Sequence, residues 1–114
     1  MGTMVFVNFP VADVQRSTAF YEKLGFKKNE EFSTEEASSM MWDDQFWIML
    51  LNHDFYGKFI QEKQIIDAQT TSGALISFSL ESAEAVKQFG ETAKANGGNC
   101  YRVDMGIPEE QTYG

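Results

Sequence analysis

The sequence predicts an α+β protein, and three observations support this fold class. Residues 4–9 alternate apolar and other side chains with a period of two, which is typical of a strand. Residues 13–24 then carry apolar side chains at helical spacing. A second strand-and-helix pattern begins at residue 73, after three more extended segments. Because the chain has 114 residues, we expect a single domain over residues 1–114.

The first strand has two faces, of different composition. One face carries Val5, Val7 and Phe9, and the other carries Met4, Phe6 and Asn8. We expect Pro10 to end this strand. Asp13 is a suitable helix N-cap, since its carboxylate accepts from free backbone N–H groups. Gly25 is expected to stop the helix.

Three further strands are predicted after the helix, over residues 26–32, 37–43 and 46–52. A tight turn at Asp43 and Asp44 joins the second of them to the third. Residues 53–72 have no clean period, so we interpret them as a partly helical connecting loop.

The segment from Gly73 repeats the opening pattern with an offset of 69 residues. The offset places Phe6 on Leu75, Asn8 on Ser77, the cap Asp13 on the cap Ser82, and Phe20 on Phe89. A strand is therefore expected at 74–80 and a helix after Ser82. Residues 99–106 are predicted to form another strand.

The charge and composition exclude several classes of partner. The net charge is −8, which repels nucleic acid backbones and anionic lipid. No apolar run is long enough for a membrane helix, and no secretory signal is visible. The single cysteine, Cys100, cannot form an intrachain disulfide, so we expect a cytoplasmic protein.

The first helix and its flanks resemble the opening of the vicinal oxygen chelate superfamily, which includes glyoxalases, bleomycin-resistance proteins and extradiol dioxygenases. The matching residues are Val11, Asp13, Ser17, Phe20, Tyr21, Leu24, Gly25 and Phe26. The resemblance implies paired βαβββ modules, whose curled mixed sheet forms a half-barrel cup with the helices outside. Module one would span about 4–52 and the connecting loop about 53–72.

Module two would span about 73–114 and is incomplete, since two of its strands lack sequence. The alternatives are a truncated sequence, an absent tail, or a partner chain that completes the sheet. We favour truncation or an absent tail, because a half-built module would leave a strand edge exposed.

Metal-dependent members of the superfamily hold a divalent ion in the cup on His and Glu or Gln ligands. The equivalent positions here are Phe6, Leu75 and Met49. None of these side chains suits a hard or borderline divalent ion. We therefore expect no metal and no cofactor. A fourth ligand would lie on the final strand of module two, beyond the given sequence.

Other residues with reactive side chains have simpler interpretations. His53, the single histidine, is expected on a surface loop. Asp43 and Asp44 are expected to be solvated turn residues rather than metal ligands. Cys100 has no histidine partner in a recognisable motif, so a nucleophilic role is not expected.

The resemblance and the strand faces together predict an apolar ligand pocket in the cup. The pocket would hold a flat or aromatic molecule against apolar side chains, with a few polar contacts. The expected ligand-binding residues are Phe6, Asn8, Trp42, Trp47, Met49, Leu75, Ser77 and Arg102.

Three functions remain open on the sequence. The first is metal-free binding of a small organic ligand, of the resistance or sequestration type. The second is a metal-dependent enzyme, such as a lactoylglutathione-lyase-like isomerase, a related lyase or a dioxygenase, with His53 recruited. The third is a dimeric module with no ligand role; members of the superfamily commonly pair, so a homodimer is expected in any case.

Overall fold

The computed structural model describes residues 2–101 of the chain. The chain divides into two compact units, Met1–Leu75 and Ile76–Gly114. The first unit contains a complete sheet, and the second contains one helix among its described residues. No helix within residues 2–101 has the length and apolar character needed to cross a membrane.

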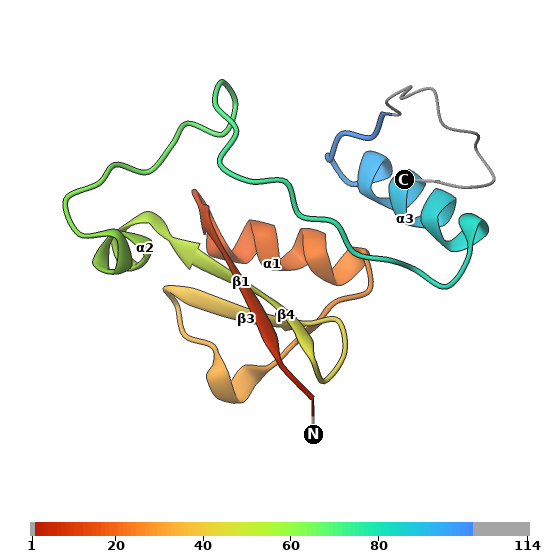
Figure 1. The fold of residues 1–114 in the computed structure, drawn as a ribbon, viewed down its shortest axis with the longest axis horizontal. Helices are drawn as coiled ribbons and strands as arrows, with labels where there is room; N and C mark the ends of the chain where they lie inside the picture. The colour runs from red at the N-terminus through yellow and green to blue at the C-terminus, as the bar shows by residue number, and fades with distance from the viewer. Residues whose placement is uncertain (1, 102–114) are drawn as a thin grey trace. The chain divides into compact units, whose positions relative to one another are not determined.

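The first unit is a four-stranded mixed sheet covered by a helix on one face. Its elements are β1 (Val5–Val11), α1 (Val14–Lys23), β2 (Lys27–Lys28), the 3₁₀ helix η1 (Glu30–Phe32), β3 (Ala37–Met41), β4 (Phe46–Asn52) and α2 (His53–Ile60). The strand order is β1-β4-β3-β2, with β1 parallel to β4 and the other pairs antiparallel. In Figure 1, α1 (orange) lies behind β1, β3 and β4. The α+β prediction and its βαβββ order are confirmed.

The strand register divides the sheet into two faces. On β3, Ser38 points toward α1, because its hydroxyl hydrogen-bonds to Thr18 of that helix. Ser38 is paired with Leu50, and Leu50 is paired with Phe9. Residues that are opposite one another in register share a face. The face toward α1 therefore carries Phe9, Leu50, Ser38 and their alternate neighbours Val7, Ile48 and Met40.

The main core lies between this face and α1. Its most deeply buried side chains come from β3 and β4, from the two ends of α1 and from the segment that follows α1: Val14, Leu24, Phe26, Met40, Ile48 and Leu50. Burying these side chains contributes roughly 1.5–3 kcal/mol each, relative to leaving them in water. The expectation that Val7 and Phe9 pack under a helix agrees with this register.

The ends of α1 follow the predicted signals. Asp13 is the N-cap and accepts a hydrogen bond from the Arg16 backbone N–H at 3.1 Å. Gly25 follows the C-cap with a φ of +108°, which glycine adopts without strain. Between these ends, burial raises the pKa of the Tyr21 phenol, so this ring stays neutral beyond the usual range of tyrosine.

Two strand boundaries differ from the prediction. Pro10 does not end β1, which continues to Val11. Since β1 is an edge strand of this sheet, a proline there need not cost a ladder hydrogen bond. The strand predicted at 26–32 is only Lys27–Lys28, followed by η1. Asn29 causes this change, because its side chain accepts from the Phe32 N–H and caps a helical turn instead.

The second unit contains α3 (Ala83–Ala95), which is capped by Ser82 as predicted. The strand expected at 74–80 is wrong, because these residues form no strand. A strand needs a partner for its backbone groups, and no segment within residues 2–101 pairs with this one. Phe78 still contacts Phe89 of α3, with ring centroids 5.6 Å apart. Residues 99–101 also form no strand, and the rest of that predicted strand lies outside the described residues.

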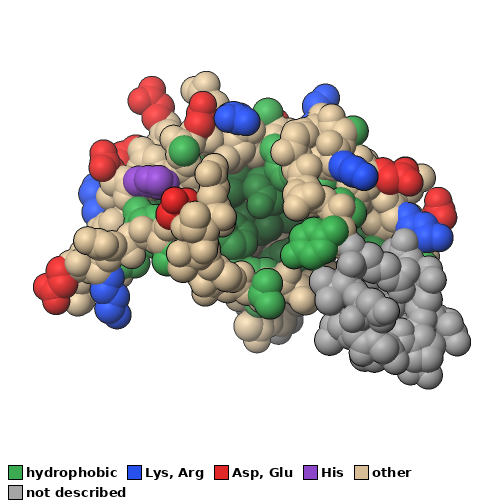
Figure 2. Space-filling view, turned by 90° about the horizontal axis from the view of Figure 1, so that it is seen from above, with side chains coloured by type: hydrophobic (Ala, Val, Ile, Leu, Met, Phe, Trp, Pro, Cys, Tyr) green, Lys and Arg blue, Asp and Glu red, His purple; other side chains and the backbone are tan. Residues whose placement is uncertain are grey.

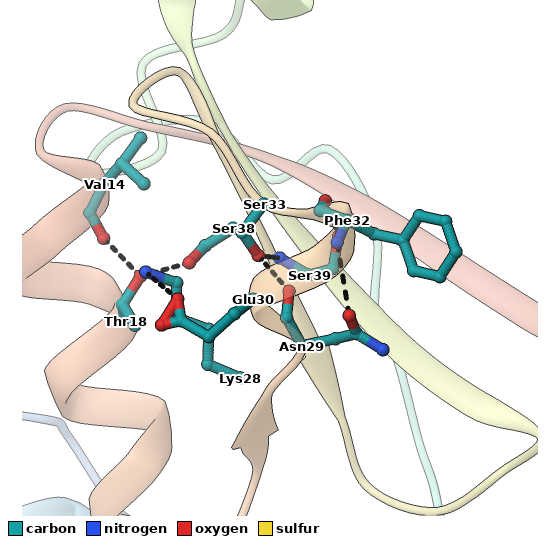
Figure 3. A network of polar contacts seen from close by, with 9 residues as sticks. All are labelled: Val14, Thr18, Lys28, Asn29, Glu30, Phe32, Ser33, Ser38 and Ser39. Atoms are coloured by element: carbon teal, nitrogen blue, oxygen red, sulfur yellow. Dashed lines mark hydrogen bonds and ion pairs between the residues drawn. The ribbon is translucent and has the colours of Figure 1, made fainter.

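A buried polar contact joins α1 to the sheet (Figure 3). The Thr18 hydroxyl lies 2.7 Å from the Val14 carbonyl oxygen and 2.7 Å from the Ser38 hydroxyl. Thr18 and Ser38 are 7% and 1% exposed, so water does not compete for these bonds. The pair therefore fixes the rotation of α1 above β3.

We expect Thr18→Val to lower the free energy of unfolding by about 1–3 kcal/mol, because the buried Ser38 hydroxyl loses its partner. The double variant Thr18→Val/Ser38→Ala should lose less than the sum of the two single variants. Urea denaturation of all four proteins measures this difference. Strictly additive losses would show that the two hydroxyls do not interact.

Candidate functional site

The sheet face opposite α1 presents an aromatic pair. We call it the Phe6 face and define it by Phe6 and Asn8 of β1, Trp47 and Met49 of β4, and Ser39 of β3. Phe6 is in register with Trp47, and their ring centroids are 5.4 Å apart. Phe6 is 48% exposed, whereas Trp47 is 7% exposed and lies beneath. The face therefore offers an accessible ring supported by a buried one.

The next register pair on this face is Asn8 with Met49. Asn8 is exposed, and its side-chain amide donates to the Phe6 carbonyl oxygen at 3.3 Å. Met49 is half-buried. A flexible thioether next to an amide gives one adaptable apolar contact and one hydrogen-bonding group, beside the aromatic pair.

The turn between β3 and β4 fixes the Trp47 end of the face. Asp43 accepts from the backbone N–H groups of Gln45 and Phe46, both at 2.8 Å. The Trp47 indole N–H donates to the Asp44 carbonyl oxygen at 3.3 Å. Asp43 is thus a turn-forming residue, in line with the sequence interpretation. The indole has its only donor satisfied within the protein.

The remaining predicted site residues are Trp42, Leu75, Ser77 and Arg102. Trp42 lies on the α1 side, where its ring is 5.1 Å from Phe26. Alternation along β3 puts Trp42 on the side of Ser38 and Met40, so the sequence carried this signal and the interpretation missed it. Leu75 is 92% exposed at the end of the first unit, and Ser77 belongs to the second unit. Arg102 lies outside the described residues.

Phe32 is an aromatic residue beside this face that the sequence interpretation did not include. It belongs to η1, and its ring centroid lies 6.4 Å from that of Trp47. The interpretation of residues 26–32 as a strand concealed it. The signal that was available is Asn29, a residue that often caps a turn three positions before the one it bonds.

The donor set of this face does not fit a divalent ion. Phe6 and Trp47 offer no metal-binding atom, and the thioether of Met49 prefers soft copper(I). Within residues 2–101, no three His, Cys, Asp or Glu side chains come together as a metal site would require. The side chains of the Phe6 face therefore do not suit metal-dependent chemistry.

The remaining reactive side chains lie elsewhere. His53 is exposed at the first position of α2, where Asn52 provides the cap. Cys100 is exposed, and its Sγ lies beside Gly90 of α3, close to where a Cβ would stand. It borders a wide depression of about 610 Å³ along α3. Within residues 2–101, neither side chain has a hydrogen bond or an ion pair with a residue that would activate it as a base or a nucleophile.

Comparison with known proteins gives a family match and a fold match. Residues 3–40 match the bleomycin resistance protein-like N-terminal family. No curated protein sequence matches the chain. A hypothetical protein from S. aureus has a similar structure, with a TM-score of 0.66 and 23% identity over 85% of this chain and 71% of that one.

Two further solved structures share the fold. A glyoxalase/bleomycin resistance protein/dioxygenase family enzyme from Burkholderia phytofirmans PsJN has a TM-score of 0.59 and 23% identity, over 84% of this chain and 74% of that one. A possible glyoxalase from Bacillus cereus has a TM-score of 0.55 and 24% identity, over 85% and 75%. At these identities the likeness to the three structures establishes the fold and not the chemistry.

The two faces of β1 lead to opposite expectations for the same substitution. Phe9→Ala should lower the free energy of unfolding by about 2–4 kcal/mol, because this side chain packs on the α1 side next to Leu50. Phe6→Ala should cost about 1 kcal/mol or less, because nearly half of its side chain is exposed. Urea denaturation provides the measurement. An equal or larger loss for Phe6→Ala would contradict the assignment of the faces.

Proposed function

We propose that this member of the vicinal oxygen chelate superfamily binds a small, flat organic molecule on its Phe6 face, without a metal ion. The superfamily assignment combines the match at residues 3–40 with the shared fold. The observation that carries the proposal is the exposed Phe6 ring held against the buried Trp47.

The aromatic pair supports a flat and apolar ligand. Aromatic rings prefer offset or tilted partners at centroid distances of about 4.5–7 Å, and Phe6 already holds such a geometry with Trp47. A ligand ring can add to the stack on the exposed side of Phe6. Apolar side chains are seen among acidic and basic ones in Figure 2. Phe6 differs from an exposed phenylalanine such as Phe59 in that it contacts a buried aromatic ring.

A small number of polar groups would orient the ligand. The Asn8 side chain is exposed and lies one register pair away from the Phe6 ring. Its amide can make further hydrogen bonds besides the one to the Phe6 carbonyl oxygen. We propose that it hydrogen-bonds a hydroxyl or carbonyl group of the ligand. We also propose that Leu75, Ser77 and Arg102, from the later part of the chain, contact the ligand. Trp42 is not a proposed ligand contact, since its ring lies on the α1 side of the sheet.

The proposed activity is sequestration or resistance rather than catalysis. Proteins of resistance type bind a compound without changing it, and such binding needs only shape and apolar contact. The apolar and amide side chains of this face support binding, and no described residue near Phe6 is placed to move a proton. We further propose a homodimer, since members of the superfamily commonly pair.

A fluorescence titration tests the proposal. In a Trp42→Phe background Trp47 is the single tryptophan, and 2-naphthol should change its emission in a saturable way. Phe6→Ala in the same background should weaken binding by roughly three- to tenfold, because one aromatic contact is lost. Phe59→Ala is a matched control: it removes another largely exposed phenylalanine, on α2, and should leave the affinity unchanged.

Two outcomes would contradict the proposal. Unsaturable emission changes, or equal losses in Phe6→Ala and Phe59→Ala, would remove the Phe6 face as the site. Tight retention of one zinc, nickel or iron ion per chain after purification without chelator would overturn the metal-free part. In that case turnover of the methylglyoxal–glutathione hemithioacetal would favour the isomerase alternative.

A further inference from the structure

We infer that Phe32 is a rigid wall of the Phe6 face and selects flat ligands over globular ones. This inference rests on the proposed function. It adds a specificity-determining residue outside the strands, together with the two side chains that position it, Asn29 and Ser39.

The ring of Trp47 contacts two phenylalanines. Phe6 is tilted by 45° against the indole and Phe32 by 65°, at centroid distances of 5.4 and 6.4 Å. Phe6 and Phe32 come from segments far apart in the sequence, yet both contact the same buried indole. Because both rings contact one indole, we place both among the contacts of a single ligand. A planar molecule can lie against aromatic rings with more of its surface than a globular one can.

The backbone of Phe32 is held at both of its polar groups. Its N–H donates to the Asn29 side-chain oxygen at 3.2 Å, and its carbonyl oxygen accepts from the Ser39 hydroxyl at 2.6 Å. Figure 3 shows these side chains around η1, with the Phe32 ring pointing away from the network. These two hydrogen bonds therefore fix the backbone that carries the Phe32 ring.

A second set of bonds ties this short turn to β3. The Ser33 hydroxyl donates to the Asn29 carbonyl oxygen at 2.6 Å, and it accepts from the Ser39 backbone N–H at 3.0 Å. The Asn29 N–H donates in turn to the Ser39 carbonyl oxygen at 2.8 Å. Ser39 is fully buried, whereas Asn29 and Ser33 are half-buried, so these bonds are partly shielded from water. Ser39 is also in register with Met49, which connects the turn to the proposed site.

The exposure of Phe32 points to a role other than folding. Its side chain is 64% exposed, so little of its apolar area is removed from water. The hydrogen bonds of Asn29, Ser33 and Ser39 that fix this turn do not involve the side chain of residue 32, so they do not require a phenylalanine there. An aromatic ring that is rigidly held, mostly exposed and in contact with the site indole has the properties of a binding anchor.

Phe59 is an exposed phenylalanine whose backbone is held in a different way from that of Phe32. It is 68% exposed on α2, and its ring contact is with Phe55 of the same helix at 5.5 Å. Its backbone is part of a regular helical turn rather than a network from another strand. Phe59→Ala is therefore the control for Phe32→Ala.

The experiment compares two alcohols with the same number of carbon atoms, flat 2-naphthol and globular 1-adamantanol, by calorimetric titration of the full chain. The unsubstituted protein should bind 2-naphthol more tightly, and Phe32→Ala should reduce this preference by roughly three- to tenfold. Phe32→Leu keeps apolar bulk but has no ring plane, so it should lose the preference as well. Phe59→Ala should keep it.

Ser39→Ala separately tests the hydrogen bond that holds the Phe32 backbone. It removes the hydroxyl that holds the Phe32 carbonyl and should lower the preference in the same direction, by a smaller factor. In a Trp42→Phe background without ligand, acrylamide should quench Trp47 more strongly in Phe32→Ala and Ser39→Ala than in the parent. A variant that only loses stability would not change the ratio of the two affinities.

The outcomes separate this inference from the proposed function. If 2-naphthol binds and the preference survives Phe32→Ala, the wall is overturned and the binding site stands. Equal binding of both alcohols to the unsubstituted protein overturns the wall in the same way. If neither alcohol binds, both the proposed function and the wall that rests on it are overturned.

Discussion

The parallel pairing of β1 with β4 is the constraint on which the rest of the first unit depends. Its register sets Phe6 on Trp47 and Phe9 on Leu50, and thereby decides which side chains enter the core beneath α1. A shift by one residue would exchange the two faces of β1 and place Asn8 against the helix. A parallel pair requires a crossover connection, and α1 provides it while covering the same sheet. One pairing thus fixes the core, the helix position and the Phe6 face.

Two adjacent serines on β3 connect this sheet to its surroundings on opposite sides. Ser38 contacts Thr18 and ties α1 to one face, whereas Ser39 bonds the Phe32 carbonyl and ties η1 to the other. Both are almost completely buried, and each has a satisfied hydroxyl. Since successive residues of a strand point to opposite faces, a Ser-Ser pair can serve both sides at one level of the sheet. The same strand therefore supports the core packing and the proposed binding face.

Local signals in the sequence predicted the first module well. The cap at Asp13, the stop at Gly25 and the alternation of Phe6 and Asn8 against Val7 and Phe9 each depend on near neighbours, and each agrees with the structure. The errors have different causes. Pro10 stays in its strand because of its edge position, and Asn29 converts half of a predicted strand into η1.

The part of the site beyond the first module was harder to predict. The segment 74–80 has strand alternation but no pairing partner within residues 2–101, and alternation alone does not make a strand. Trp42 is different, because the alternation of Ser38, Met40 and Trp42 along β3 does indicate the α1 side, where its ring lies. Methionine methyl NMR during a 2-naphthol titration tests the Phe6 face most directly. Met49 lies on that face and Met40 is fully buried on the α1 side, so the account predicts a shift of the Met49 methyl signal with Met40 unchanged. A shift of Met40 without Met49 would contradict it.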